Sequence, residues 1–180
     1  MKNKKLKSIL SEVRFFLMVI LVAFVFQHNV ALHASVPTPS MSPTVKVGDH
    51  LLVNCLTYKF NDPMQGDIIT FYHKETDKIF PVKYLKRVIA CPNDTIDIKD
   101  NTIYVNDIAL DESAYLLEGV NTYAYAFDFP YTLPENQYFV MGDNREDSAD
   151  SRFWGTVDRK DILGKAEYVI FPFNDIHELK

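Results

Sequence analysis

The chain has 180 residues, 47% of them hydrophobic and 13% aromatic, so it can bury a core and is not a disordered polymer. Its net charge of −5 is unevenly spread, because residues 1–14 carry five basic side chains and one acidic one. The remaining 166 residues hold 14 basic and 23 acidic side chains. An acidic body argues against a nucleic-acid partner, since phosphate binding needs clustered Lys and Arg.

A strongly apolar segment follows the basic head. Residues 15–26 are uninterrupted apolar residues, 27–29 are polar, and Val30 begins a second, shorter apolar run. A membrane span takes about 20 residues and the apolar part of a secretory signal about 7–15, so length alone does not separate the two.

A cleavable leader would also need small residues at its processing site. Ala34 suits the last position of such a site, but Leu32, two residues earlier, is too large. We therefore expect an uncleaved transmembrane helix over residues 15–33. The basic residues 1–14 then lie in the cytoplasm and residues 34–180 lie at the outer, extracytoplasmic surface of the cell membrane.

A proline-rich stretch, residues 36–44, comes directly after this anchor. Its three prolines fix φ and remove backbone donors, which excludes a helix and favours an extended segment. The segment presents small hydroxyl side chains, including Ser40 and Ser42. A Pro/Ser/Thr linker would also fit this composition, but Met41 and Val45 favour a structured edge.

The rest of the chain alternates short apolar runs with turn residues, which is typical of β-strands. Strands are predicted at 51–53, 67–72, 80–90, 95–98, 102–105, 138–141 and 166–171. Residues 111–135 lack periodicity, and we expect them to join the 95–105 hairpin in a small irregular subdomain spanning about 95–135. The predicted fold is mainly β, with one N-terminal transmembrane helix and a barrel-like body.

Two cysteines, Cys55 and Cys91, lie far apart and neither belongs to a C-x-x-C pair, which argues against common zinc frameworks. A disulfide between them stays open. The charged run 142–152 does not fit a calcium loop either, because a loop begun at Asp143 lacks the glycine and the glutamate that it requires. Neither pattern therefore predicts a metal site.

One lysine stands out in the predicted strand 80–90. With a period of two, Lys86 is the single charge in a row that also contains Val82, Tyr84 and Val88. An exposed lysine at a sheet edge is the commoner situation. A buried one would have a lowered pKa and could act as a general base. No histidine falls in a usable motif, although a Ser-His-Asp arrangement with His50 is conceivable, so a Ser–Lys pair is favoured for acyl transfer.

Three separated stretches then match one family in the correct order. Ser40-Met41-Ser42-Pro43-Thr44, Lys86-Arg87-Val88-Ile89 and the run from Gly142 to Arg152 resemble the signature boxes of bacterial type I signal peptidases, and Gly66-Asp67-Ile68-Ile69 resembles a fourth. The basic head, the anchor and the compact length are similar to the single-span forms of Gram-positive bacteria.

This resemblance implies a role for each matching residue. Ser40 would be the nucleophile and Lys86 its general base, with Ser148 orienting the amine. The Ser40 N–H and the Thr38 hydroxyl would bind the oxyanion. The residues expected to brace the loop around the site are Arg87, Asp143, Asp150 and Arg152.

The resemblance also implies the substrate. Signal-peptide-bearing preproteins would bind as an added strand beside residues 36–40 and be cleaved after small side chains in an A-x-A pattern. Shallow pockets for those side chains would be lined by Val36, Met41, Val45, Tyr84 and Leu85. The lipid bilayer would be the second partner, and the resemblance implies no metal and no cofactor.

Two other functions are compatible with parts of this sequence. A non-enzymatic chaperone on the same fold would be expected to lose the nucleophile or the base, and both are present. A self-cleaving repressor would carry a DNA-binding helix pair in place of an anchor. Both alternatives are therefore disfavoured against a membrane-bound serine endopeptidase.

Overall fold

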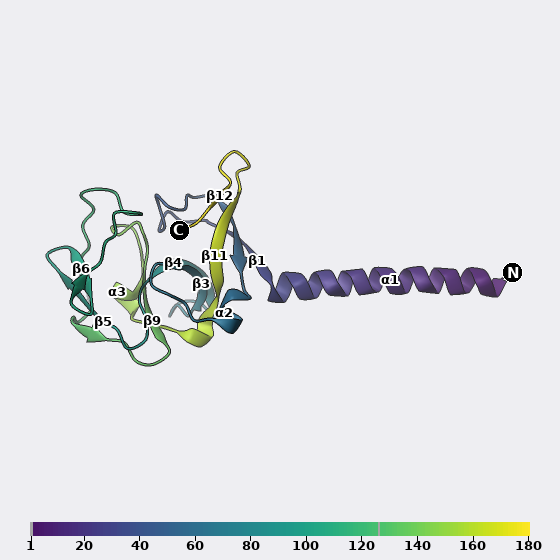
Figure 1. Cartoon of the computed structure of the whole chain (residues 1–180), viewed down its shortest axis with the longest axis horizontal. Coiled ribbons are helices and arrows are strands. Elements are labelled where there is room, and N and C mark those ends of the chain that lie inside the picture. The colour runs from purple at the N-terminus through teal and green to yellow at the C-terminus, as the bar shows by residue number, and fades with distance from the viewer. Residues whose placement is uncertain (1, 126) are drawn as a thin grey trace.

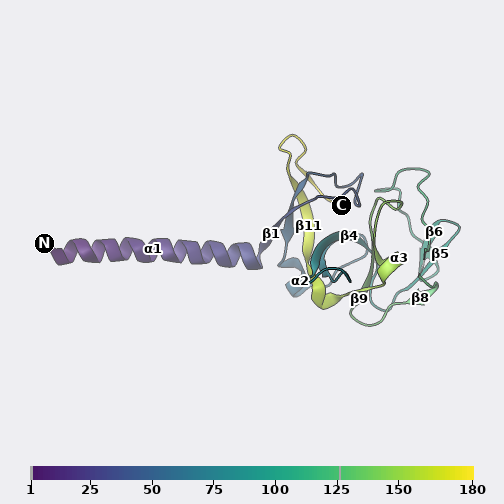
Figure 2. The same cartoon turned by 180° about the vertical axis from the view of Figure 1, so that it is seen from behind.

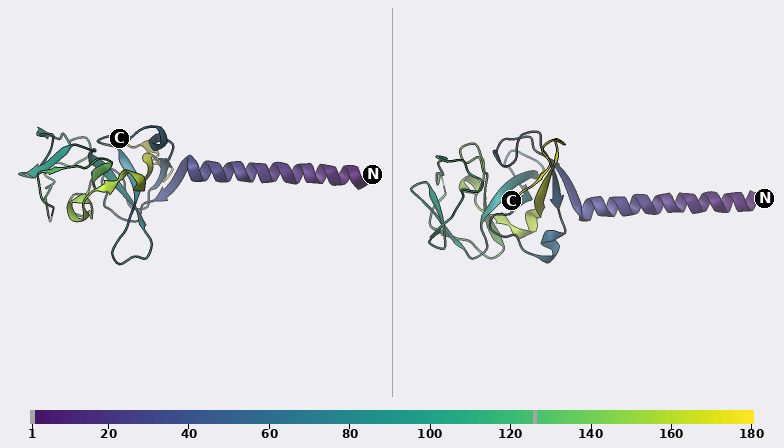
Figure 3. Two further views of the ribbon diagram at one scale, coloured as in Figure 1. Left: turned by 90° about the horizontal axis from the view of Figure 1, so that it is seen from below. Right: turned by 45° about the horizontal axis from the view of Figure 1, so that its top comes forward.

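The computed structural model describes residues 2–125 and 127–180, with residues 2–8 and 24–29 described by their backbone alone. A single helix, α1 (Lys2–Asn29), projects from a β-rich body (Figures 1 and 2). Both views of Figure 3 show the same arrangement, with α1 leaving the body beside β1. The chain therefore consists of one rod-like helix and one folded body.

The body is built on an eight-stranded antiparallel sheet. Its strands run in the order β1-β2-β11-β3-β4-β9-β10, with β12 pairing to β11 outside this path. The bounds are β1 (Ala31–Ser35), β2 (His50–Asn54), β3 (Ile68–His73), β4 (Val82–Ala90), β9 (Gln137–Met141), β10 (Val157–Asp158), β11 (Ile162–Phe171) and β12 (His177–Glu178). Neighbours in this sheet come from distant parts of the chain.

A second, four-stranded sheet caps one end of the body. Its order is β7-β6-β5-β8, with β5 (Thr95–Lys99), β6 (Thr102–Val105), β7 (Ile108–Ala109) and β8 (Tyr131–Thr132). The β5–β6 hairpin turns at Asp100 and Asn101, whose φ angles of 49° and 63° are those of a type I′ turn. The predicted hairpin is therefore confirmed, with the short polar residues that such a turn prefers.

The other helical elements after α1 are single turns. They are α2 (Thr57–Phe60), α3 (Ser151–Trp154) and the 3-10 helix η1 (Arg159–Asp161). Residues 111–130 contain no strand or helix in the described part of the chain. The irregular excursion predicted over residues 111–135 is thus confirmed up to residue 130, whereas Tyr131 and Thr132 form β8 and pair with β5.

Strand β4 holds the two sheets together. Its residues Lys86 to Ala90 are all buried, because apolar clusters cover both faces of the strand from that point on. On one face Val88 packs with Phe71 and Val140, and on the other Ile89 packs with Ile96 of the small sheet. The buried part of β4 begins with two charged residues, Lys86 and Arg87, which are therefore enclosed as well.

Two parts of the predicted fold need correction. The mainly β, antiparallel body is confirmed, but β1 and β10 end the large sheet without pairing to each other in the described residues, so the sheet is not a closed barrel. The helix ends at Asn29, and residues 31–33, assigned to the anchor, belong to β1 and pair with β2. Leu32 and Ala34 of β1 pack against the buried cluster that contains Leu51 and Val53, which explains why apolar residues resume there.

Within the described part of the chain, we find no helical segment with both the length and the apolar character that a membrane crossing requires. Several residues of the predicted anchor, 24–29, lie outside the described side chains. The two cysteines are both free thiols, so no disulfide joins them.

Gly164 in β11 tests how closely the central strands are packed. A Cβ at this position would lie 2.6 Å from the carbonyl oxygen of Asn54 and 3.0 Å from a methyl carbon of Val53. Gly164→Ala should therefore lower the free energy of unfolding by about 1–3 kcal/mol, since backbone has to move to accept the methyl group. Chemical denaturation measures the change, and an unaltered midpoint would contradict the close approach.

Candidate active site

The segment after β1 is pinned to the body before it reaches Ser40. The Val36 N–H donates to the Asp49 carbonyl at 3.0 Å, and the Gly48 N–H donates back to the Val36 carbonyl at 2.8 Å. Beyond Pro39 the chain turns, because the Ser42 N–H donates to the Pro39 carbonyl at 2.9 Å. Ser40 thus lies where the extended segment becomes a turn. The prediction of an extended segment over residues 36–44 therefore holds only up to this turn.

Lys86 reaches this serine from β4. Its Nζ lies 2.7 Å from Ser40 Oγ, and its residue is only 2% exposed. The Tyr84 ring covers the amine from two residues earlier on the strand, with the ring centre 5.4 Å from Nζ. The predicted alternation therefore holds, and the lysine is buried instead of lying at an exposed edge.

Burial changes the acidity of this amine. Removal from water lowers the pKa of Lys86 from 10.5 to about 8, while the negative charges of Asp150 and Asp143 oppose the shift. A substantial fraction of the amine is consequently neutral near pH 8. A neutral amine within hydrogen-bond distance of a hydroxyl can accept its proton.

Two further hydroxyls lie near the pair. Thr38 Oγ1 is 3.4 Å from Ser40 Oγ. Ser148 Oγ is buried and has no hydrogen-bond partner among the described residues. The contact expected between Ser148 and the Lys86 amine is therefore not formed in this structure, although the unpaired hydroxyl is available to a nearby ammonium or ligand.

Gly142 makes the close approach of these groups possible. A Cβ on Gly142 would lie 2.3 Å from both Ser148 Oγ and the Ser40 carbonyl oxygen. The next loop residues bind the serine segment directly: the Asn144 N–H donates to the Ser40 carbonyl at 3.1 Å and its side-chain amide donates to the Pro39 carbonyl at 3.2 Å. The loop and the serine segment are thus one packed unit.

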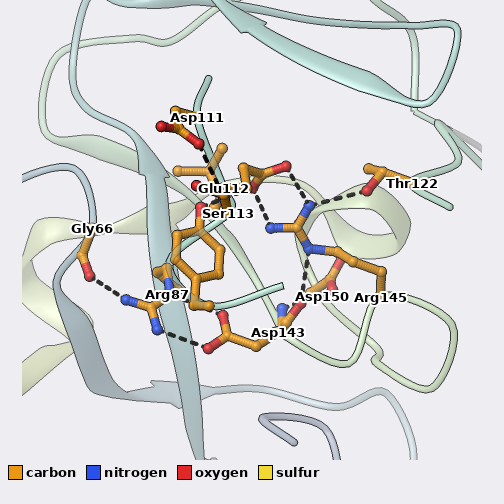
Figure 4. Close-up of polar contacts among 12 residues, drawn as sticks. Gly66, Arg87, Asp111, Glu112, Ser113, Thr122, Asp143, Arg145 and Asp150 are labelled. Carbon is orange, nitrogen blue, oxygen red and sulfur yellow. Dashed lines mark hydrogen bonds and ion pairs between the residues drawn. The ribbon is translucent and has the colours of Figure 1, made fainter. Parts of the chain in front are cut away.

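An ion pair joins β4 to the same loop. Arg87 Nε and Nη2 donate to the two carboxylate oxygens of Asp143 at 2.9 and 2.8 Å, and Nη1 donates to the Gly66 carbonyl at 2.8 Å (Figure 4). The Tyr115 ring packs on the guanidinium, 4.0 Å from its centre. Asp143 also accepts the Thr44 hydroxyl at 2.6 Å, so one carboxylate ties the serine segment, β4 and the loop together.

Two more buried arginines hold the remainder of the loop. Arg152 Nε donates to Asp150 at 2.8 Å, and Asp150 in turn accepts the Gly142 N–H at 3.1 Å. Arg145 donates to the Gly142 carbonyl at 3.0 Å and binds Glu112 from the irregular segment (Figure 4). The loop residues singled out in the sequence are therefore brought together around Gly142.

A groove of about 720 Å³ runs past the Ser40–Lys86 pair. One wall is formed by residues 32–41 and the other by residues 82–86. The groove is lined by four of the five expected pocket residues, Val36, Met41, Tyr84 and Leu85. The fifth, Val45, is fully buried in the cluster behind Met41 and does not line it.

The 82–86 wall has a free strand edge in the described part of the chain. On one side β4 pairs with β3 along its whole first half, whereas on the other side β9 begins pairing only at Arg87. An extended peptide entering the groove can therefore add to this edge. The arrangement fits a site that binds a peptide backbone and presents a hydroxyl–amine pair to it.

Some contributors were not singled out in the sequence, namely Thr44, Glu112, Tyr115, Gly142, Asn144 and Arg145. Gly142 and Arg145 stand inside the charged run, but nothing in that run distinguishes a packing glycine from a turn. Glu112 and Tyr115 lie in a segment without periodicity, so no pattern indicates their contacts. His50, considered for a triad, instead places Nδ1 2.6 Å from Nε2 of His33.

Comparison with known proteins agrees with this geometry. A family model described as "Signal peptidase, peptidase S26" matches residues 9–171. The chain belongs to the signal peptidase family, peptidase S26. The family resemblance carried by the three motifs is thereby confirmed, as is its assignment to the serine peptidases.

Relatives with curated names are of the same kind. "Signal peptidase I" of Bacillus licheniformis is 33% identical over 182 residues, which cover 98% of this chain and 95% of the relative. "Probable signal peptidase I-2" of Synechocystis sp. is 34% identical over 139 residues, covering 76% of this chain, and the match spans 62% of that relative's length. A crystal structure of a signal peptidase I from Enterococcus faecalis superposes with a TM-score of 0.46 at 30% identity, over 58% of this chain and 97% of that one.

The lowered pKa of Lys86 has a consequence for stability. Below pH 8 the folded protein holds a buried ammonium, which lowers the free energy of unfolding. Between pH 8 and pH 10.5 the folded protein has lost this proton while the unfolded chain still binds it, so the free energy of unfolding rises with pH. Lys86→Met should thus be more stable than the wild type at pH 7, and the difference should shrink by about 2–3 kcal/mol by pH 10. Denaturation of the detergent-solubilised full chain at both pH values measures this.

The matched control is Lys83→Met, which removes an exposed ammonium from the same strand. An equal dependence on pH in both variants would contradict the assignment of the effect to burial of Lys86.

Proposed function

We propose that this chain is a membrane-anchored serine endopeptidase that releases N-terminal signal peptides from exported preproteins, using Ser40 as nucleophile and Lys86 as general base. The observation that carries the proposal is the 2.7 Å separation of Lys86 Nζ and Ser40 Oγ, with the amine buried and its pKa lowered to about 8. Family membership supplies the reaction class.

The chemistry follows from the pair. Neutral Lys86 accepts the Ser40 proton while Oγ forms a bond to the scissile carbonyl carbon, and the carbonyl π electrons move to the oxygen. The Ser40 N–H and the Thr38 hydroxyl donate to that oxyanion. The Lys86 ammonium then protonates the departing amine, which leaves an ester on Ser40.

A water molecule completes the turnover. Lys86, neutral again, accepts a proton from water as the water oxygen attacks the ester carbon. The proton returns to Ser40 Oγ when the ester bond breaks. In this proposal the ammonium form of Lys86 donates to Ser148 Oγ, which is buried and has no hydrogen-bond partner among the described residues. The Arg87–Asp143 and Asp150–Arg152 pairs keep the loop that carries Ser148 in position.

The free edge of β4 accounts for substrate binding. A signal-peptide segment adds as a strand between residues 82–86 and 36–40, so that backbone hydrogen bonds supply affinity independently of side-chain identity. Alternate side chains of an added strand point to the same wall. Shallow apolar pockets around Met41, Leu85 and Tyr84 accept small side chains, which gives the A-x-A preference.

The anchor completes the proposal. The apolar part of α1 crosses the cell membrane once, residues 1–14 stay in the cytoplasm, and the body from residue 34 onwards works at the outer surface. The bilayer and the preprotein are the two partners. No nucleic acid, metal or cofactor takes part.

The dyad is tested by cleavage of one preprotein with the full chain in detergent. Ser40→Ala and Lys86→Arg should each lower kcat/KM by about 10³-fold or more, because one lacks the nucleophile and the other carries a guanidinium that does not deprotonate. Ser42→Ala is the matched control and should stay active. Full activity of Lys86→Arg would refute the dyad, and inactivation by Ser42→Ala alone would mean that the wrong serine was chosen.

The pH dependence of kcat/KM provides an independent test. Since the base must be neutral, kcat/KM should rise about tenfold per pH unit in acid and level off above an inflection at about 8, the pKa of Lys86. An initial-rate series on the wild type measures it. An inflection near about 6.5 would indicate a histidine as the base.

A further inference from the structure

A second cavity opens beside the point where α1 meets the body. It has a volume of about 480 Å³, and its lining includes Leu32, Cys55, Lys59, Tyr72 and Lys83. We propose that this cavity, called here the basic pocket, binds the phosphodiester headgroup of an anionic membrane lipid through Lys59 and Lys83. The inference rests on the proposed anchor, because it requires the end of α1 to lie at a bilayer surface.

The position of the pocket is fixed by the chain next to α1. The Cys55 N–H donates to the Val30 carbonyl at 3.0 Å, one residue beyond the end of the helix. Leu32, on β1, lines the pocket and the peptide groove alike. Figures 1 and 2 both show α2 at the end of the body from which α1 leaves. The pocket therefore lies within a few residues of the proposed membrane surface.

The charges around the pocket favour an anion. The thiol of Cys55 has its pKa raised by burial, while the positive charges of Lys59 and Lys83 act in the opposite direction. Two lysines from separate elements, α2 and β4, thus direct positive charge at one half-buried atom in the cavity. An ammonium group binds phosphate as a point charge and does not require the planar geometry of arginine.

The rim of the pocket resembles an interfacial surface. Phe60, next to Lys59 on α2, is 82% exposed, and Tyr72 is 41% exposed with the Lys83 ammonium 5.8 Å from its ring centre. Exposed aromatic rings beside lysines suit the boundary between headgroups and acyl chains, where an apolar ring and a charged group are both accommodated. The two ammonium groups would attract the negative charge of a lipid phosphodiester, whereas they would not stabilise an apolar substrate side chain.

Binding of a lipid headgroup in the basic pocket would orient the body relative to the bilayer. A headgroup held by Lys59 and Lys83 fixes the face of the body that contacts the bilayer, and Lys83 also borders the peptide groove. The mouth of the groove would then face the membrane in which the signal peptide lies. The pocket would act on substrate capture, separately from the bond-breaking step at Ser40.

Cys55 supplies a reporter inside the pocket. The full chain is placed in nanodiscs of phosphatidylcholine, either alone or mixed with phosphatidylglycerol, and treated with N-ethylmaleimide. Peptide mass spectrometry then gives the alkylation rate of Cys55 itself. Phosphatidylglycerol should slow this rate by about fivefold or more relative to phosphatidylcholine alone, as expected when ligand exceeds its Kd several-fold.

Variants separate the pocket from general charge effects. Lys59→Ala/Lys83→Ala should lose the lipid-dependent slowing, whereas Lys59→Arg/Lys83→Arg should retain it. The matched control Lys99→Ala/Lys160→Ala removes two exposed lysines from other elements and should behave as the wild type. Each variant is compared with itself in the two lipids, so a changed intrinsic thiol reactivity cancels, and circular dichroism confirms that each is folded.

Several results would overturn the proposal. One is an equal Cys55 rate in the two lipids, and another is retained slowing in the double alanine variant. Equal protection of the detergent-solubilised chain by free glycerol phosphate would indicate a soluble phosphate ligand, and protection by a signal-sequence peptide alone would make the pocket part of the substrate groove.

The Ser40→Ala protein should show the same lipid protection, so failure of the dyad is distinguishable from failure of the pocket. If the chain does not remain with the nanodiscs, the proposed anchor is wrong and the lipid pocket is wrong with it.

Discussion

Lys86 must be kept away from water and at the same time reach a hydroxyl that faces an open groove. These two requirements are met by the position of one residue on β4. From Val82 to Leu85 the strand borders the groove. From Lys86 onwards the strand is buried, and from Arg87 onwards it also pairs with β9. The amine therefore sits at the boundary between an edge that can bind peptide and a core that removes solvent.

The charged residues around this boundary serve geometry more than stability. Three arginines, Arg87, Arg145 and Arg152, are essentially buried, and each binds a carboxylate. A buried ion pair gains little net stability over an apolar pair, but removing one partner leaves an uncompensated charge and costs several kcal/mol. Such pairs tolerate only one arrangement of the loop that follows β9. That arrangement places Gly142 against Ser40 and Ser148.

The small sheet and the irregular segment are part of this support. Glu112 binds Arg145 and accepts the Tyr115 hydroxyl at 2.8 Å, while the Tyr115 ring lies on Arg87. A segment without regular structure thus contacts two of the three buried arginines. The same segment also packs Phe127 and Phe129 against Phe139 of β9, so it both contributes to the core and pairs with charges on the loop after β9.

Sequence patterns alone predict the local features of this protein: the longer strands β2 to β6, β9 and most of β11, the hairpin at Asp100 and Asn101, the lone lysine in an apolar row and the family motifs. They miss the two-residue strands β7, β8, β10 and β12. The predicted features follow from period-two alternation and turn chemistry, which depend on neighbouring residues only. The sequence could not separate β1 from the apolar segment before it, since Val30 to Leu32 are apolar in either case. Three features emerge only in the folded chain: Lys86 is buried, Val45 lies behind the groove, and Glu112 binds Arg145. Those outcomes depend on contacts between residues far apart in the chain, and pairing across a sheet leaves no signature in either partner alone.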